Sequence, residues 1–338
     1  MISLKEIKTY IEKSENPLIF FDDDPDGLCS YLLIKRYFKK GRGIYLKSSP
    51  EVGENYIKKV NEICPDLIII LDKPKLSQDF VDKVNVPLIY MDHHHPIDVK
   101  GIKYFNPQLI DPKDNRPTSH WCYKLVNNDL WVAMVGIVGD WCLENIKEFS
   151  KKYENLLPKK FETPDDVLFG SRIGELSMIF YFILKGKTSD VNKAITILTK
   201  IEEPYEILDQ TTSRGKFIYR QAQKMKKDYD YLLEDILEKV DLNKKFIIYI
   251  YTTSKNSYTS MLSNELLHRF KDKVIIIGRE KSGEIRMSLR SSKKKLPKVI
   301  EKSLEGLEGY GGGHEHACGA CVKKEDFNEF VKRLEKYL

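Results

Sequence analysis

The feature that most constrains the fold of this chain is an apolar run that ends abruptly in acids. Residues 18–30 read LIFFDDDPDGLCS, and a continuous apolar run of this kind is typical of a parallel strand that is buried on both faces. Four acids stand where that strand leaves the sheet: Asp22, Asp23, Asp24 and Asp26. We expect Gly27 to permit the turn into a helix over residues 28–39.

Carboxylates gathered at one strand end repel one another unless cations hold them together. Their oxygens are hard ligands, so the cations that suit them are divalent and hard or borderline, such as Mn²⁺ or Mg²⁺. An acidic turn on the protein surface is the alternative explanation, because a single motif of this kind also occurs by chance.

Three later stretches favour the metal site over the acidic turn. Two more apolar strands are predicted at Leu67–Leu71 and Leu88–Met91, and a further apolar segment spans 132–138. Candidate metal ligands follow them: Asp72 after the first, Asp92, His93, His94 and His95 after the second, and Asp140 after the third. In an open parallel α/β sheet the functional site lies beyond the carboxyl ends of the strands, so these side chains are aimed into one crevice.

The first half of the chain alternates strands with helices, which argues for a parallel sheet with helices on both faces. Further helices are predicted over 3–13, 55–63, 76–84 and 118–126, and further strands over 43–47 and, as an edge strand, 102–105. Residues 106–117 read as a loop, and Thr118 with Ser119 would cap the helix after it. We therefore predict an α/β fold with a parallel-sheet N-terminal domain over residues 1–185.

The middle of the chain, from residue 145 to 241, is predicted to be helical, polar and rich in lysine, with a buried helix over 169–184. We expect residues 186–241 to form a helical linker that includes a long charged helix over 213–240. That helix carries six cations: Arg214, Lys216, Arg220, Lys224, Lys226 and Lys227. Either it is a solvated linker, or it forms a basic wall along a cleft between two domains.

A smaller α/β domain is predicted over residues 242–338. Its strands are expected at 246–251, 274–278, 284–289 and 317–322, and its helices at 257–270, 296–304 and 324–337. The glycines of 309–313 predict a flexible loop. A chain of 338 residues has ample length for two domain cores.

The order and spacing of the acids and histidines resemble the DHH phosphoesterase family. Its four N-terminal motifs are matched here by Asp24-Pro25-Asp26-Gly27, Asp72, Asp92-His93-His94 and Asp140. The C-terminal half is similar to the DHH-associated domain, in RMSLRSS around Arg290 and in GYGGGHEHACGA around His314. Many members have a histidine where this chain has Phe20, and the extra acid Asp22 is more like the RecJ-type nuclease branch.

The resemblance implies a centre of two Mn²⁺ ions, with Mg²⁺ as a substitute. The implied metal ligands are Asp22, Asp24, Asp26, Asp72, His93 and Asp140. Asp72 would bridge both ions from its central strand. Asp24 and Asp26, two apart on an extended backbone, would point the same way and serve one ion each.

The remaining residues of the first domain receive supporting roles from the same resemblance. His93 and Asp140 would complete the site of the second ion, and His94 would be a catalytic residue that contacts the substrate phosphate. Asp92 would orient His93 or His94 from behind. His95 matches no role in the family pattern, and we expect it to be a loop residue.

The second domain is expected to bind the phosphate of the substrate. Arg290 offers a planar fork that matches phosphate oxygens. Gly311, Gly312 and Gly313 would let backbone amides approach an anion closely, and His314 would be a second catalytic residue that donates to the scissile phosphate. A merely mobile loop is the alternative explanation of the glycines.

The resemblance implies a phosphodiesterase that releases mononucleotides from single-stranded DNA or RNA, or from short oligonucleotides. The chain has room for the two shared domains, but little for the extra oligonucleotide-binding fold of full bacterial RecJ. Two other classes stay open: a phosphodiesterase of cyclic dinucleotides or other small molecules, and a scaffold subunit in replication or repair. Degenerate scaffold relatives lose metal ligands, which this chain retains. We expect no membrane association, and a replication or repair protein is a candidate partner.

Composition adds weaker expectations. The net charge of +6 suits a polyanionic partner, but it also suits a lysine-rich surface with ion-pair networks. Cys318 and Cys321 lack the second pair that a zinc site needs, so we expect them in a buried strand. Trp121 and Trp141 are expected to be packing residues rather than stacking platforms. No apolar leader begins the chain and no apolar run reaches about 20 residues, which predicts a cytoplasmic location.

Overall fold

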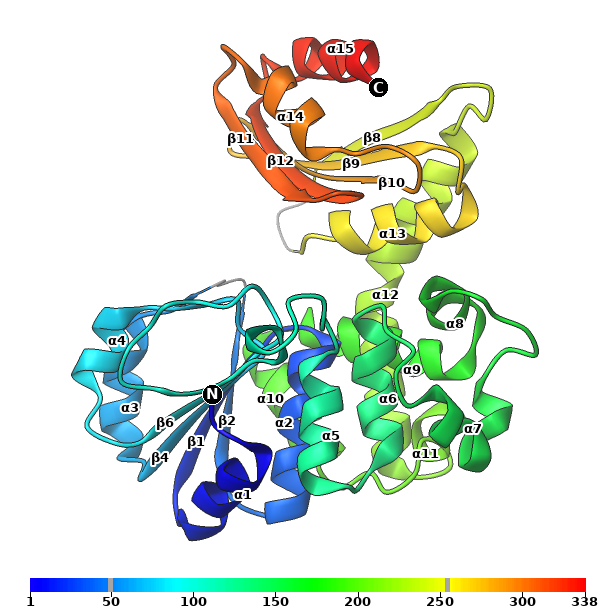
Figure 1. Ribbon diagram of the computed structural model, residues 1–338. Helices are drawn as coiled ribbons and strands as arrows, with labels where there is room; N and C mark the ends of the chain where they lie inside the picture. Colours follow the sequence, from blue (N-terminus) through cyan, green and yellow to red (C-terminus); the bar gives the residue numbers. More distant parts are fainter. Residues whose placement is uncertain (48–50, 253–255) are drawn as a thin grey trace. The chain divides into compact units, whose positions relative to one another are not determined.

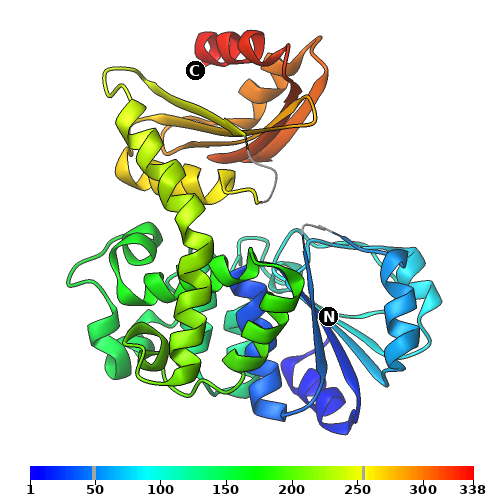
Figure 2. The same ribbon diagram turned by 180° about the vertical axis from the view of Figure 1, so that it is seen from behind.

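The computed structural model describes residues 1–47, 51–252 and 256–338. The chain divides into two compact units, Met1–Lys224 and Met225–Leu338 (Figure 1, Figure 2). The division falls inside one long helix, α12 (Ser213–Lys239), so the segment predicted as a linker is shared between the two units.

Unit 1 is built on a five-stranded parallel sheet with the strand order β2-β1-β4-β6-β7. Its strands are β1 (Pro17–Asp22), β2 (Arg42–Leu46), β4 (Leu67–Leu71), β6 (Leu88–Met91) and β7 (Lys103–Phe105). The apolar residues of β1, β4 and β6 are all buried, as expected for strands that are covered on both faces. The predicted parallel sheet and the edge position of β7 are confirmed.

Helices cover both faces of this sheet (Figure 1). On one face lie α3 (Ile57–Ile63) and α4 (Gln78–Lys83), and on the other lie α2 (Pro25–Phe38), α5 (Thr118–Val126) and α6 (Leu130–Gly139). The buried side chains on the α3 and α4 face come from alternate residues of the strands, such as Phe20, Ile68 and Ile70. This alternation follows from the two-residue period of a strand.

Several short elements complete the sheet domain. Helix α1 (Leu4–Lys13) begins with a capping box, in which Ser3 and Glu6 each accept a hydrogen bond from the other's backbone. The remaining pieces are β3 (Glu51–Val52), paired in parallel with β5 (Lys75–Leu76), and the 3₁₀ turns η1 (Glu54–Tyr56) and η2 (Pro107–Leu109).

Helix α2 begins at Pro25, so Gly27 lies in its first turn and not in a turn before it, contrary to the prediction. A Cβ atom added to Gly27 would lie 2.7 Å from the backbone nitrogen of Asp22. Glycine is therefore needed for close approach. The first turn of α2 packs directly against the end of β1, which keeps the acids of both elements in one place.

The helical segment of unit 1 differs from the prediction at one point. The helix predicted over 169–184 is found as α9 (Arg172–Leu184), but its first two residues belong to the end of another helix, α8 (Pro164–Gly170). The Ser171 side chain accepts a hydrogen bond from Gly174 N–H and so starts α9. The other elements are α7 (Ile146–Tyr153), η3 (Glu154–Leu156), α10 (Thr188–Leu198) and α11 (Tyr205–Leu208). Within the described ranges no single helix has the length and apolar composition to span a membrane, although α8 and α9 taken together, bent by 77°, do.

Unit 2 is a mixed five-stranded sheet with the order β11-β12-β10-β9-β8, in which only the β8–β9 pair is parallel. Its strands are β8 (Phe246–Thr252), β9 (Val274–Lys281), β10 (Glu284–Ser291), β11 (Gly309–His314) and β12 (Ala317–Lys323). Its helices are α13 (Thr259–Arg269), α14 (Pro297–Leu304) and α15 (Phe327–Tyr337). Cys318 and Cys321 are buried, unpaired residues of β12, as predicted.

The flexible loop predicted at 309–313 is wrong, because these residues form the edge strand β11. Packing explains its glycines at three positions, and at Gly309 a Cβ atom would lie 2.5 Å from the carbonyl oxygen of Cys321. A Cβ atom on Gly311 would lie 2.7 Å from Cγ2 of Ile300 in α14, and one on Gly313, at φ +143°, would lie 2.6 Å from the carbonyl oxygen of Ala317. Only Gly312 faces open space among them, with nothing within 4 Å of an added Cβ.

The contact at Gly27 gives a prediction about stability. Gly27→Ala should destabilise the protein by about 1–3 kcal/mol through overpacking against β1, although alanine is the better helix former. Gly170→Ala is the matched control, since its Cβ would meet nothing within 4 Å. Thermal unfolding followed by circular dichroism measures both variants. A Gly27→Ala protein as stable as the Gly170→Ala protein would contradict the close approach of α2 to β1.

Candidate metal centre

The ends of three neighbouring strands bring acids together at one edge of the sheet. Asp22 is the last residue of β1, Asp72 follows β4, and Asp92 follows β6. Backbone hydrogen bonds continue past the strands, since Asp72 N–H donates to Met91 O at 2.9 Å and Asp92 N–H donates to Phe105 O at 3.1 Å. The acids are therefore positioned by the sheet itself.

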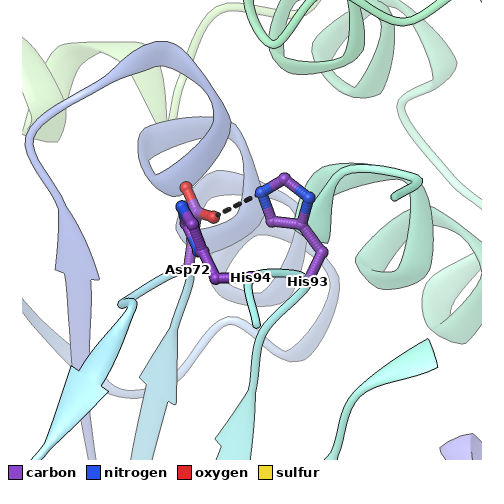
Figure 3. Close-up of side chains that lie close together, drawn as sticks. All are labelled: Asp72, His93 and His94. Carbon is purple, nitrogen blue, oxygen red and sulfur yellow. Dashed lines mark ion pairs between the residues drawn. The ribbon is translucent and has the colours of Figure 1, made fainter. Parts of the chain in front are cut away.

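His93 lies between two of the predicted metal ligands. Its Nε2 atom is 3.4 Å from Asp72 Oδ1 and 3.5 Å from Asp140 Oδ2. Candidate ligand atoms of Asp26, His93 and Asp140 lie within 4.8 Å of one another, and so do those of Asp72, His93 and His94. Figure 3 shows Asp72, His93 and His94 beyond the strand ends, with the Asp72–His93 ion pair dashed. Four elements thus deliver their ligands to one place.

Asp26 also holds the start of another helix. Its carboxylate accepts hydrogen bonds from Thr118 N–H at 2.8 Å, from Ser119 N–H at 3.0 Å and from the Ser119 hydroxyl. The prediction that Thr118 and Ser119 cap α5 is therefore wrong: they are its first residues, and Asp26 supplies the acceptor. A carboxylate is favourable there because the free N–H groups and the dipole of a helix make its N-terminus positive. Thr118 Oγ1 also donates to Asp72 Oδ1 at 3.2 Å.

Asp24 has a different conformation from Asp26. It is the N-cap of α2, with extended φ and ψ of −131° and 174°, and its Oδ1 accepts a hydrogen bond from Gly27 N–H at 2.9 Å. Because Asp26 lies inside the helix, the predicted extended backbone shared by the two acids is wrong. Burial, followed by the charges of Asp72, Asp22 and Asp26, raises the pKa of Asp24. The charge of Asp24 thus interacts with those of the other acids in the cluster. Its role as a metal ligand stays a prediction.

Lys73 is a member of the site that the motifs do not reveal. Its side chain is 1% exposed, and Nζ lies 2.7 Å from Asp22 Oδ1. Burial and the charge of Asp72 raise the pKa of Asp22 to about 6, while Lys73 opposes the rise. Asp22 is therefore already paired with the ammonium group of Lys73. Its role as a metal ligand stays a prediction. The only signal in the sequence is a lysine directly after a strand-end acid.

Asp92 orients His94 and not His93. Asp92 Oδ1 lies 2.8 Å from His94 Nδ1, and Oδ2 accepts a hydrogen bond from His94 N–H at 3.0 Å. Asn106 Nδ2 donates to His94 O at 2.8 Å, and Gln108 Nε2 donates to His93 O at 2.6 Å. The loop predicted at 106–117 thus fixes the two histidines, which its composition alone does not indicate. His95 is exposed in the same segment.

The charges in the cluster depend on one another. Burial disfavours a charged His93, but its hydrogen bond to Asp72 and the charges of Asp140, Asp72 and Asp26 outweigh burial and raise the pKa of His93 to about 11. Burial opposes ionisation of Asp72 as well, yet His93 and His94 lower the pKa of Asp72 to about 2. Burial raises the pKa of Asp140 to about 6, against the charge of His93. Without metal, therefore, a proton on His93 balances the acids.

The donor set fits divalent ions such as Mn²⁺ and Mg²⁺, which prefer carboxylate oxygens and, for Mn²⁺, accept imidazole. Asp72 Oδ2 is buried and receives no hydrogen bond from residues 1–47, 51–252 and 256–338. A buried carboxylate oxygen without a partner is costly unless a cation takes that place. Asp72 meets this criterion, and the other residues close enough to hold metal with it are Asp26, His93, His94 and Asp140.

The chain turns sharply where α6 ends at the site. Trp141 N–H donates to Val138 O at 3.2 Å, and Cys142 N–H donates to Ile137 O at 3.0 Å. These two bonds form a Schellman motif, in which the residue at the position of Trp141 adopts a left-handed conformation and is usually glycine. Trp141 has φ 59°, a conformation that costs a residue other than glycine about 1–2 kcal/mol.

The two tryptophans expected to be packing residues differ in the structure. Trp121 packs as predicted, with the ring of Phe105 at 5.2 Å between centroids and the Arg116 guanidinium at 4.4 Å. Trp141 is 38% exposed, and the Phe169 ring lies beside it at 6.0 Å between centroids. Trp141 is therefore only partly a packing residue.

In unit 2, the guanidinium of Arg290 is largely engaged within its own unit. Nε donates to Asn264 Oδ1 at 2.6 Å, Nη2 donates to Ser260 Oγ at 3.1 Å, and Nη1 donates to the carbonyls of Leu289 and Cys318 at 2.9 and 3.2 Å. These bonds use four of the five N–H groups of an arginine. A bidentate contact with phosphate would displace Ser260.

The other residues predicted to bind phosphate lie on the edge strand β11. Gly311, Gly312, Gly313 and His314 are all exposed, and β11 has only β12 as a neighbour within its sheet. An edge strand presents backbone groups that no second strand satisfies. Backbone amides are thus open to an anion here, from a strand and not from a loop.

Two family models match the chain. The model of the DHH family N-terminal domain matches residues 16–161, and that of the DHHA1 domain matches residues 243–338. An uncharacterised protein of Methanocaldococcus jannaschii is 22% identical over 395 residues, which cover 93% of this chain and 91% of that protein.

Solved structures share the fold. RecJ of Thermus thermophilus, in complex with Mn²⁺, superimposes with a TM-score of 0.69 at 15% identity, over 99% of this chain and 54% of that chain. The present chain thus spans about half the length of that RecJ. The pGpG-specific phosphodiesterase PggH of Vibrio cholerae has a TM-score of 0.52 at 16% identity, over 94% of this chain and 97% of that chain. The predicted fold is confirmed.

The raised pKa of His93 predicts that metal binding releases protons. At pH 8 the metal-free imidazole, with a pKa of about 11, is protonated, and a metal ion must displace that proton to bind. Mn²⁺ affinity should therefore rise with pH, by about tenfold per unit for each proton released. Calorimetric titration in buffers of different ionisation enthalpy counts the protons. The His93→Gln protein should release fewer protons on binding Mn²⁺, and the His95→Gln control should release as many as wild type. An Mn²⁺ affinity that does not depend on pH would contradict the assignment of His93 as a metal ligand.

Proposed function

The chain belongs to the DHH family of phosphoesterases, and we propose that it is a manganese-dependent nuclease that releases mononucleotides from an end of single-stranded DNA or RNA, or from short oligonucleotides. The observation that carries the proposal is the cluster of Asp26, Asp72, His93 and Asp140, in which one buried oxygen of Asp72 is left for a cation. A RecJ of the same fold is in complex with Mn²⁺, which supports the choice of metal.

The proposed chemistry follows from the charge of the substrate. A phosphodiester resists hydrolysis because its negative charge repels a nucleophile, and bound divalent ions supply both a hydroxide at neutral pH and charge neutralisation at the phosphate. Asp72 would bridge the two ions, with Asp24 and Asp26 on one ion each. His93 and Asp140 would complete the second site. The positions of these ligands at strand and helix ends keep the site preorganised.

His94 is the residue proposed to contact the substrate phosphate. Its side chain is 40% exposed, and Asp92 holds its Nδ1 atom. Burial disfavours the charged ring, but the hydrogen bond and the charge of Asp92 outweigh burial and raise the pKa of His94. A charged imidazole can bind a phosphate oxygen and donate a proton to the leaving oxygen.

The residues of unit 2 are proposed to bind the phosphate of the same substrate. His314 is exposed at the end of β11 and can donate a hydrogen bond. The open position of Gly312 lets an anion approach the strand backbone. Arg290 would add its positive charge and its remaining N–H group from β10.

A second candidate function is hydrolysis of a dinucleotide or another small phosphodiester. The likeness to PggH, which is specific for pGpG, favours this function, and every residue named above would serve in it. A purely structural role as a replication or repair subunit is less well supported, because a scaffold needs no cluster of metal ligands. A replication or repair partner, a role in DNA repair and a cytoplasmic location stay predictions.

Digestion of end-labelled substrates tests the proposal. DNA and RNA oligonucleotides labelled at the 5′ or the 3′ end, and a set of dinucleotides, are incubated with the protein and Mn²⁺. We expect mononucleotides from one end of the long strands from the first time point, and no product after chelation. Turnover confined to dinucleotides would favour the second candidate. Metal-loaded protein that cleaves none of these substrates would overturn both.

Removal of the proposed bridging ligand should abolish the activity. Asp72→Asn keeps the shape of the side chain and removes its charge, and we expect a loss of at least about a hundred-fold in kcat, since even residues behind the ligands contribute 10–100-fold in such sites. Asp98→Asn, which removes an exposed acid from the segment after the histidines, is the control and should keep wild-type rates. A folded Asp72→Asn protein with wild-type activity would refute the metal assignment.

His314 should act on the chemical step and not on metal binding. His314→Ala removes a donor to the phosphate and should lower kcat by about a hundred-fold, with manganese content unchanged by elemental analysis. His316→Ala is the matched control two residues away, because the His316 ring lies against Lys294 O in its own unit. If His314→Ala lost its metal instead, His314 would belong among the ligands. Arg290→Ala is a poorer probe, since it also removes four internal hydrogen bonds.

A further inference from the structure

Trp141 stands in a position that its side chain makes unfavourable. The Schellman turn at the end of α6 needs a left-handed residue there, and glycine meets that need without a steric cost. The chain instead places its bulkiest residue type at φ 59°. A strained conformation of this kind is a reason to look for a function of the side chain.

Packing accounts for only part of the tryptophan. Trp141 is 38% exposed, so a large part of its surface is left in contact with solvent. The Phe169 ring of α8 lies 6.0 Å away between centroids, tilted by 65°. This edge-to-face contact supports the indole from one side and leaves surface of the ring open.

The location of the indole connects it with the metal centre. Trp141 directly follows Asp140, whose Oδ2 lies 3.5 Å from His93 Nε2, and consecutive Cα atoms are only about 3.8 Å apart. The hydrogen bonds of the Schellman motif fix the turn between the two residues. An exposed aromatic ring is therefore held within the reach of one nucleotide from a group that is proposed to bind metal.

We propose that Trp141, supported by Phe169, is a stacking platform for a nucleobase of the strand whose phosphate lies at the metal centre. The inference rests on the proposed nuclease function and adds a binding site for the base. Aromatic stacking is tolerant of sequence, because every base has a π face. The site would thus distinguish nucleotides that carry a base from those that do not, without reading which base is present.

The test compares substrates with and without a terminal base. Single strands are prepared with an abasic nucleotide at the 5′ end, at the 3′ end or at neither. For the wild-type protein, kcat/KM should be about 5- to 150-fold higher when the end at which it cleaves carries a base than when that end is abasic. This is the range for loss of one stacked base. Trp141→Gly should lose most of that preference, and Trp141→Phe should retain much of it.

Stability separates stacking from a structural role. Trp141→Gly relieves the left-handed strain, so its melting temperature should equal or exceed that of wild type; Trp141→Asn, which also tolerates this conformation, is the second variant without a ring. Asn127→Gly is the matched control, because Asn127 also ends a helix in a left-handed conformation. It lies at the end of α5 opposite to Thr118, which contacts the metal centre. It should keep the preference for a base. A preference unchanged in folded Trp141→Gly or Trp141→Asn would overturn the proposal.

A binding measurement distinguishes failure of this inference from failure of the proposed function. Adenosine 5′-monophosphate is titrated into manganese-loaded protein while tryptophan fluorescence is recorded. Stacking should quench the emission of wild type but not that of Trp141→Phe, in which Trp121 and Trp131 remain. Quenching in a protein that cleaves no strand would uphold the base site and refute the nuclease. Cleavage without quenching and without a preference for a base would refute only the base site.

Discussion

Crowded negative charge is the constraint on which unit 1 depends. Carboxylates from β1, α2, the end of β4 and the end of α6 converge where burial makes an uncompensated charge costly. The chain compensates in three ways: Lys73 pairs with Asp22, a protonated His93 lies between Asp72 and Asp140, and the N-terminus of α5 faces Asp26. One buried oxygen of Asp72 is satisfied by none of the described groups. The remaining deficit of positive charge is what would draw divalent ions into the site.

The rigidity of the site has the same origin as the fold. Ladder hydrogen bonds past β4 and β6 fix Asp72 and Asp92, and Asp92 in turn fixes the His94 ring. Backbone carbonyls of the two histidines are held by Asn106 and Gln108 from the following segment. Ligands that are already in place lose little entropy when an ion or a phosphate arrives. A parallel sheet is suited to this task because its strands all end at one edge.

The strands and the acids that end them could be predicted because each depends on a local pattern. The short apolar runs before Asp72 and His93 are the buried strands β4 and β6. The longer apolar run before Asp140 is the buried helix α6. In both cases the polar residue that ends the run marks the site. The errors concern residues whose roles depend on distant parts of the chain. The contact of Gly27 with Asp22 and the cap that Asp26 gives to α5 come from tertiary packing. The same holds for β11, where the packing of α14 explains Gly311 better than flexibility does.

The two helix ends at this site place different physical demands on their acids. Asp26 serves the N-terminus of α5, so a relative that has lost its catalysis would still benefit from an acid or an asparagine there, for folding alone. Asp140 closes the C-terminus of α6, where the helix dipole disfavours negative charge. A nearby cation offsets this cost, as the His93 ring does at 3.5 Å when it is protonated. Among descendants of this protein, the acid at position 140 should disappear first when hydrolysis is no longer selected, which makes it the better marker of a working enzyme.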